Sequence, residues 1–297
     1  MHLLIIIITI IFSIYLIVLL VLGRFLGYND VFKRKVPDKA CIEGYLYENI
    51  EFKTSQGLKL KGWFLISNAN LTNRTLILLH GWHRNRERLI NHAKLFVDNG
   101  FHVIIYDQRS HGESDTGLIT FGKGEAIDLL SCVEYLKTKP NINIDKLGAL
   151  GFSLGSGGLV YAAASSEKSI FKAIVLEGAY ANSYDTGLFM LQNRFGKIVG
   201  YLIGVMFFTI GTKIMSLGKF YHSKPYKYIG DIKNTPIMIV RGENDYMVPK
   251  YSSERLINAI TTTKYIWINE GGNHTDSFVI YPEEYKARVL EFLNKYL

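Results

Sequence analysis

Cysteine is scarce in this sequence. The 297 residues include only two, Cys41 and Cys132, and they lie far apart with no metal-ligand spacing around them. A disulfide framework needs several cysteines, and a zinc site needs paired cysteine or histidine ligands at short intervals. The sequence therefore indicates neither a disulfide-stabilised scaffold nor a metal site.

Internal repeats and low-complexity tracts are also lacking, apart from one apolar run at the N-terminus. The formal net charge is +8, but the basic residues are scattered, with one cluster at 33–35 directly after the apolar segment. A basic cluster in that position suits anionic lipid better than nucleic acid. We therefore expect no nucleic-acid partner. The length fits one large α/β domain.

The apolar run covers residues 3–22 and is interrupted only by Thr9 and Ser13. A predominantly apolar segment of twenty residues is long enough to span a bilayer. A cleaved signal peptide is the alternative, but no lysine or arginine precedes the run and no small-residue cleavage site follows it. The sequence predicts an uncleaved, single transmembrane helix over residues 1–23 and a juxtamembrane linker over 24–43.

The orientation of this predicted helix follows from the basic residues beside it. Only the amino terminus and His2 lie upstream, whereas Arg24, the 33–35 cluster and Lys39 lie downstream. The positive-inside rule therefore places the remainder of the chain in the cytoplasm.

Residues 44–297 show strands and helices in alternation. Strands are expected at 45–53, 58–66, 76–79, 103–106, 146–150, 173–176, 236–240 and 265–268, and helices at 87–99, 125–139, 156–165, 251–260 and 283–296. The first two strands read as a hairpin. The alternation that follows predicts an α/β fold, with a mainly parallel sheet covered by helices on both faces.

The alternation breaks between about 180 and 230. Within this segment, Ile198 to Thr212 is almost wholly apolar but is too short to span a membrane. We interpret the segment as a helical cap insertion over the substrate site. A second buried core helix is the alternative interpretation.

The sequence from Gly151 to Gly155 matches the Gly-x-Ser-x-Gly nucleophile elbow, which holds a serine on a strained turn between a strand and a helix. Here that serine is Ser153, and a predicted strand and helix flank it in the required order. Glycines are needed because the strand and the helix approach each other closely at the turn. The alternative is a glycine-rich connection without a catalytic role.

Acyl transfer by a serine needs a base and a carboxylate that orients the base. Asp245 follows the strand at 236–240, and His274 follows the last strand. Strand ends at one edge of a parallel sheet meet at one crevice, so these residues are expected beside Ser153. Glu243 is the alternative acid, and His83 and His111 also lie at strand ends.

The predicted oxyanion donors are two backbone N–H groups. One belongs to Leu154, the residue after the nucleophile, and the other to Trp82, in the loop after the strand at 76–79. His80, at the start of that loop, is expected to brace it.

These residues together resemble the α/β-hydrolase superfamily over residues 44–297. Residues 107–114 look like the Asp-x-Arg-Gly-His-Gly-x-Ser segment common in its esterase, lipase and peptidase members, with Ser110 in place of the usual glycine. Residues 242–249 resemble the acid loop, although Arg241 stands where many members have histidine. With the N-terminal segment, the set looks most like membrane-anchored Bem46-type and serine aminopeptidase-like hydrolases.

The expected function is a membrane-anchored serine hydrolase that cleaves a carboxylic ester or thioester, with a lipophilic acyl group, through an acyl-enzyme on Ser153. Its partners are then a small-molecule or lipid acyl substrate and the membrane, and no metal or organic cofactor is implied. A serine peptidase is the alternative within the same fold. A non-catalytic membrane scaffold is the alternative from another class.

Overall fold

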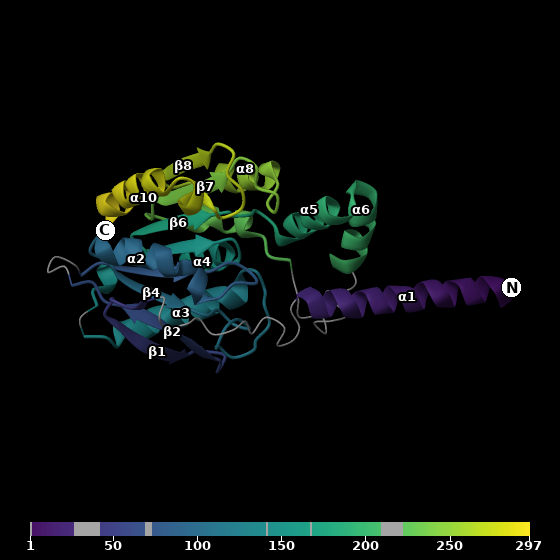
Figure 1. The fold of residues 1–297 in the computed structure, drawn as a ribbon, viewed down its shortest axis with the longest axis horizontal. Coiled ribbons are helices and arrows are strands. Elements are labelled where there is room, and N and C mark those ends of the chain that lie inside the picture. Colours follow the sequence, from purple (N-terminus) through teal and green to yellow (C-terminus); the bar gives the residue numbers. More distant parts are fainter. Residues whose placement is uncertain (1, 27–41, 69–72, 141, 167, 209–221) are drawn as a thin grey trace.

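An eight-stranded sheet forms the centre of the protein in the computed structural model, which describes residues 2–26, 42–68, 73–140, 142–166, 168–208 and 222–297 (Figure 1). The strands are β1 (Tyr47–Lys53), β2 (Lys59–Leu65), β3 (Thr75–Leu79), β4 (His102–Tyr106), β5 (Leu147–Phe152), β6 (Ala173–Glu177), β7 (Ile237–Gly242) and β8 (Lys264–Asn269). Their order across the sheet is β1-β2-β4-β3-β5-β6-β7-β8. β2 pairs antiparallel with β1 and with β4, and all the other pairs are parallel. The predicted hairpin and the mainly parallel sheet are therefore confirmed.

Helices cover both faces of this sheet. They are α2 (Ile90–Asp98), α3 (Lys123–Lys137), α4 (Leu154–Ala164), α8 (Lys250–Asn258), α9 (Ser277–Ile280) and α10 (Pro282–Tyr296). The helix expected at 87–99 begins as a short 3-10 helix, Arg86–Leu89, before α2. The short helix α9 was not foreseen.

The apolar core divides into two layers, one on each face. Neighbouring strand residues point to opposite faces, so that Ile77 and Leu79 pack toward α3 and α4 while Leu76 and Leu78 pack toward α2 and α10. Each fully buried side chain of this size contributes roughly 1.5–3 kcal/mol to folding. The parallel strands are thereby held so that their carboxyl ends share one edge, at which the predicted catalytic residues follow β5, β7 and β8.

The predicted cap segment contains two helices, α5 (Ser183–Phe195) and α6 (Lys197–Met206), which project from the sheet and its covering helices (Figure 1). A Cβ atom at Gly200 would lie 2.4 Å from the backbone oxygen of Leu191, and one at Gly204 would lie 2.5 Å from Leu188 Cδ1. The glycines of α6 thus allow it to pack closely on α5. Because only these two glycines of α6 are buried, α6 is not the buried core helix of the alternative interpretation. Residues 209–212 lie outside the described residues.

The N-terminal apolar segment forms α1 (His2–Leu26), which extends away from the sheet (Figure 1). Its exposed apolar side chains include those of Leu3, Ile10 and Ile17. In the part of the chain that the structure describes, no helix has the length and apolar character needed to cross a membrane. The prediction of a membrane-spanning anchor over residues 1–23 is therefore not confirmed. Most of the predicted linker, 27–41, lies outside the described residues.

Candidate active site

Ser153 lies on the turn between β5 and α4, with φ 52° and ψ −109°. A side chain in this left-handed region strains the backbone, at a cost of order 1–3 kcal/mol. Such strain persists only where surrounding structure enforces it. Here the N–H of Ser153 donates a hydrogen bond of 2.9 Å to the carbonyl oxygen of Glu177, at the end of neighbouring β6.

The two glycines of the elbow are required by close packing. A Cβ atom at Gly155 would lie 2.4 Å from the backbone oxygen of Leu79, and one at Gly151 would lie 2.7 Å from the oxygen of Gly155. Any larger residue would force α4 away from β3 and β5. The glycines of the motif therefore fix where Ser153 stands at the sheet edge.

Asp245 and His274 are in contact. Nδ1 of His274 lies 2.8 Å from Oδ2 of Asp245, and Oδ1 of Asp245 accepts hydrogen bonds of 2.9 and 2.8 Å from the N–H groups of Met247 and Val248. A carboxylate only accepts, so the contact assigns the ring proton to Nδ1. In neutral His274, Nε2 is then the basic nitrogen.

The alternative acid and the alternative histidines lie elsewhere. Glu243 is exposed, and its carboxylate accepts a hydrogen bond of 3.2 Å from the N–H of Gly271. His111 is buried with Nδ1 2.8 Å from the carbonyl oxygen of Arg109, and His83 packs its ring on Trp82. The structure therefore brings Asp245 and His274 together, as the order of the chain predicts.

The end of β6 lies between the serine and the histidine. A Cβ atom at Gly178 would lie 2.8 Å from Cε1 of the His274 ring, and the preceding residue, Glu177, is the one bonded to the N–H of Ser153. Nε2 of His274 has no hydrogen-bond partner in the described structure, so it is not bonded to Ser153. In free enzymes such bonds are often long and tighten only with substrate.

The loop after β3 approaches the serine from the other side. A Cβ atom at Gly81 would lie 3.4 Å from Cβ of Ser153, which places the following residue, Trp82, near Ser153. His80 braces this loop, because its Nδ1 donates to the carbonyl oxygen of Gly81 at 2.9 Å and its Nε2 accepts from the N–H of Gln108 at 3.0 Å. Burial lowers the pKa of His80 well below its ordinary value and keeps the ring neutral. The oxyanion roles of Trp82 and Leu154 stay predictions.

Residues 107–114 act as a brace for the same edge. Asp107 is buried and accepts hydrogen bonds from the N–H of Arg86 at 2.8 Å, from Nη1 of Arg86 at 2.9 Å and from the N–H of Glu113 at 2.9 Å. Ser110, where the resembled segment has glycine, takes φ 62°. A left-handed backbone at this position explains why glycine suits it.

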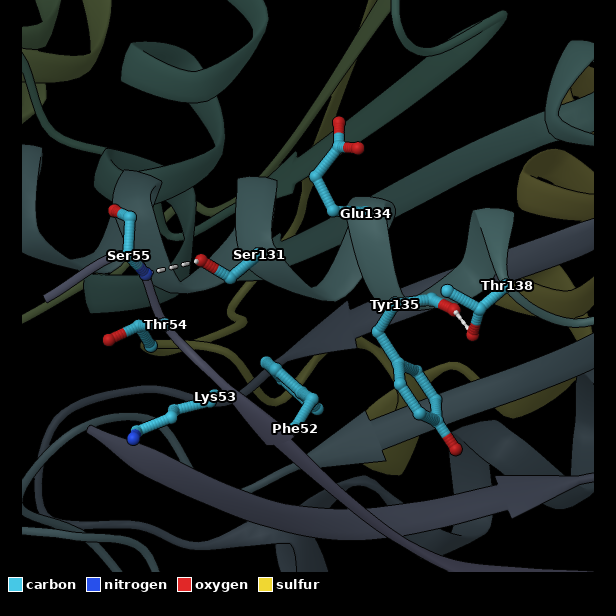
Figure 2. Close-up of a pocket in the computed structure, with 8 residues that line it drawn as sticks. All are labelled: Phe52, Lys53, Thr54, Ser55, Ser131, Glu134, Tyr135 and Thr138. Carbon is cyan, nitrogen blue, oxygen red and sulfur yellow. Dashed lines mark hydrogen bonds between the residues drawn. The ribbon is translucent and has the colours of Figure 1, made fainter. Parts of the chain in front are cut away.

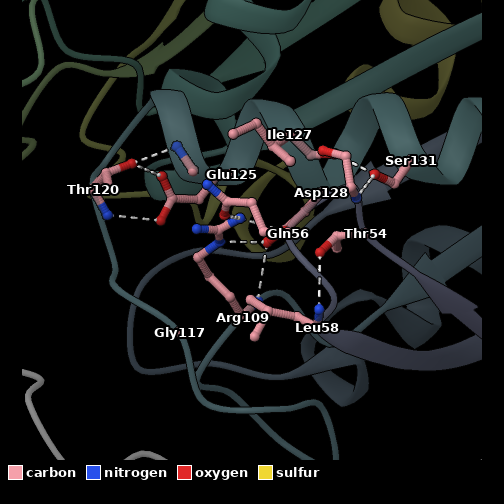
Figure 3. Close-up of polar contacts among 12 residues, drawn as sticks. Thr54, Gln56, Leu58, Arg109, Gly117, Thr120, Glu125, Ile127, Asp128 and Ser131 are labelled. Atoms are coloured by element: carbon pink, nitrogen blue, oxygen red, sulfur yellow. Dashed lines mark hydrogen bonds and ion pairs between the residues drawn. The ribbon is translucent and has the colours of Figure 1, made fainter.

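A second buried ion pair joins this segment to α3 (Figure 3). Arg109 donates from Nε at 2.9 Å and from Nη2 at 2.7 Å to the two carboxylate oxygens of Asp128. Burial raises the pKa of Asp128 to about 6, although Arg109 opposes the shift. Glu125 adds bonds to Thr120 and to the N–H of Gly122. The Arg86–Asp107 and Arg109–Asp128 ion pairs hold loops in place, and neither is bonded to Ser153.

Glu177, the last residue of β6, has a buried carboxyl that the sequence analysis did not identify. Its Oε1 accepts a hydrogen bond of 3.2 Å from the N–H of Ser277, and the ionisable side chains that face it are His274 and Tyr285. Burial raises the pKa of Glu177 to about 7, while the bond from Ser277 and the charge of His274 oppose the shift. The sequence feature that could have pointed to this buried carboxyl is an acidic residue directly after the apolar strand expected at 173–176.

A shallow groove of about 410 Å³ lies apart from these residues (Figure 2). It is formed between β1, the turn after it and α3, and contains none of the predicted catalytic residues. Within the described residues, no group of three or more histidine, cysteine, aspartate or glutamate side chains is arranged to hold a metal ion.

We predict that Glu177→Gln removes a pH dependence of stability. The unfolded carboxyl loses its proton near 4.5 and the folded one near 7, so stability is lost as pH rises through this window. Relative to wild type, the variant should gain up to about 3 kcal/mol between pH 4.5 and 8, since one pKa unit is about 1.4 kcal/mol. Urea unfolding of both proteins at pH 4.5 and at pH 8 measures the free energy of unfolding that this comparison needs. Glu243→Gln, at an exposed carboxyl, is the control, and parallel pH profiles for wild type and Glu177→Gln would contradict the prediction.

Comparison with known proteins supports the interpretation of the fold. A family model described as the α/β hydrolase fold matches residues 74–202. YfhR of Escherichia coli O157:H7 is 23% identical over 260 residues, which cover 83% of this chain and 82% of that protein. The thiohydrolase aneE of Aspergillus aculeatus is 31% identical over 128 residues, 42% of this chain and 39% of its own.

Among solved structures, the Pyrococcus furiosus esterase Pf2001 superposes with a TM-score of 0.70 and 23% sequence identity, covering 91% of this chain and 99% of that one. Identity at this level indicates a shared fold, and function depends on the site that the fold carries. Together with the family model and the order of the strands, this similarity shows that the chain has the α/β-hydrolase fold.

Proposed function

We propose that the protein is a serine hydrolase that cleaves carboxylic esters or thioesters through an acyl-enzyme on Ser153. One observation carries the proposal: a strained serine stands at the same sheet edge as a buried His274–Asp245 pair. The esterase and thiohydrolase named among the similar proteins favour an ester or thioester over a peptide bond.

In the proposed first step, Oγ of Ser153 attacks the carbonyl carbon of the substrate while Nε2 of His274 takes the hydroxyl proton. Asp245 holds the ring and stabilises the imidazolium that forms. The N–H groups of Leu154 and Trp82 donate to the oxyanion. The intermediate then expels the alkoxide or thiolate, which receives the proton from His274, and the acyl group stays on Ser153.

In the second step, water attacks the acyl-enzyme. His274 takes a proton from the water, the second tetrahedral intermediate collapses, and the proton returns to Oγ of Ser153. The products are a carboxylic acid and an alcohol or thiol.

The proposal includes attachment to a membrane through α1. The apolar side chains exposed along this helix and the basic residues 33–35 after it support lipid contact. The cytoplasmic position of the catalytic domain was inferred from a membrane span, and it stays a prediction.

Labelling with a fluorophosphonate tests the nucleophile. Wild type should be labelled and Ser153→Ala should not, because the reagent needs an activated serine oxygen. Ser165→Ala is the matched control, because Ser165 is exposed and lies at the C-terminal end of α4, the helix that begins directly after Ser153. This variant should be labelled like wild type. Equal labelling of Ser153→Ala and wild type would refute the assignment and would favour a non-catalytic scaffold.

Asp245→Asn should lower kcat for an ester substrate by about 10⁴-fold, because the amide would favour the wrong ring tautomer of His274. Its thermal midpoint should stay close to that of wild type. Glu243→Gln is the matched control and should change kcat little. If Glu243→Gln lowered kcat more than Asp245→Asn did, Glu243 and not Asp245 would be the residue that orients His274. If wild type cleaved peptides faster than esters, the peptidase alternative would be favoured.

Attachment by α1 is tested by cell fractionation of the full chain. Substituting lysine at Ile6, Ile10 and Ile14 together should move most of the protein from the membrane pellet to the supernatant, because charge in place of these exposed apolar side chains weakens lipid contact. The single substitution Leu46→Lys, on the β1 side of the sheet, should leave the distribution unchanged. An unchanged pellet fraction for the triple variant would rule out attachment by α1.

A further inference from the structure

One face of α6 is apolar and exposed. The residues on it are Ile198, Val199, Tyr201, Leu202 and Met206, with exposed fractions from 42% for Met206 to 77% for Ile198. The opposite face carries the two glycines that pack against α5. Because the apolar side chains are spaced for one side of a helix, they form a continuous outward surface, here called the α6 face.

The stretch of sequence that contains α6 carries charge of a single sign. From residue 186 to residue 230 the sequence contains no aspartate or glutamate. Arg194 and Lys197 are exposed and lie directly beside Phe195 and Ile198, so cations border the apolar surface. An exposed apolar helix face bordered by cations is typical of helices that lie in the surface of an anionic bilayer.

The cap is connected to the candidate active site. Nδ2 of Asn193, on α5, donates a hydrogen bond of 2.9 Å to the carbonyl oxygen of Tyr246, the residue after Asp245. The cap helices and α1 project from the same side of the sheet (Figure 1). A bilayer in contact with the α6 face would therefore lie on the side of the molecule from which α1 also projects (Figure 1).

We propose that the α6 face docks on the surface of an anionic lipid bilayer and that the ester delivered to Ser153 is an acyl ester of a membrane lipid. The docking stands on the exposure and charge of the cap, whereas the choice of substrate rests on the proposed hydrolase function. A second copy of the chain is a poorer occupant of this face, because the sequence from 186 to 230 contains no aspartate or glutamate and so offers no opposite charge to the partner's Arg194 and Lys197.

Docking is tested with the full chain carrying Val199→Cys, labelled with an environment-sensitive fluorophore, in a Cys41→Ser background. The remaining Cys132 is buried and should not react. On adding phosphatidylglycerol-containing vesicles, emission should shift to the blue, and pure phosphatidylcholine vesicles should give a weaker shift. The label at Leu46→Cys, on the β1 side of the sheet, should not shift. No shift at Val199, or equal shifts at both positions, would overturn the docking.

The substrate is tested by Leu202→Glu. Turnover of a long-chain ester embedded in the same vesicles should fall about tenfold or more, because a carboxylate replaces apolar contact and is repelled by anionic lipid. Turnover of a water-soluble short-chain ester should stay unchanged. Leu46→Glu is the matched control, since Leu46 is 54% exposed and Leu202 is 57% exposed. It should leave both turnovers unchanged.

The two tests separate the two proposals. A fluorescence shift without hydrolysis of either ester would uphold the docking and refute the hydrolase. Hydrolysis of both esters with equal losses in Leu202→Glu would refute the role of the α6 face in delivering a membrane lipid. Emission that shifts only after adding a protein fraction, with vesicles having no effect, would replace the bilayer by a protein partner.

Discussion

The close approach of α4 to β3 and β5 is the constraint on which the rest of the site depends. Ser153 takes a left-handed backbone conformation at the start of this helix, and α4 then passes so close to Leu79 that only glycine fits at position 155. Strain of this kind is maintained by the packing around it. The buried layers on both faces of the sheet supply that packing, and they fix Ser153 at the edge where the other parallel strands also end.

The carboxyl end of β6 links the two halves of the site. The carbonyl oxygen of Glu177 accepts from the N–H of Ser153, its carboxyl accepts from the N–H of Ser277, and Gly178 packs against the ring of His274. One short segment thus touches both the strained turn and the histidine loop. The buried carboxyl also faces His274, so its proton affects the electrostatic field at that imidazole as well as the stability of the fold.

Buried charges around the sheet and exposed charges at α5 and α6 have different surroundings. Inside, Arg86 and Arg109 are buried against carboxylates with several hydrogen bonds each, and this geometry offsets the cost of removing charge from water. Arg194 of α5 and Lys197 of α6 lie at the surface beside exposed apolar side chains. The first arrangement fixes loops around the sheet edge, and the second suits contact with an external anionic surface.

The sequence by itself determined the mainly parallel sheet and the turn at Ser153 between a strand and a helix, because strand alternation and the glycine motif are local patterns. Only the tertiary structure decided that Asp245 rather than Glu243 meets His274, because the choice depends on how the turn after β7 faces the loop after β8. It likewise decided that α6 turns its apolar side outward. The raised pKa of Glu177 also depends on tertiary structure, because α9 and α10 reach this carboxyl from a distant part of the chain and together with the sheet exclude water from it.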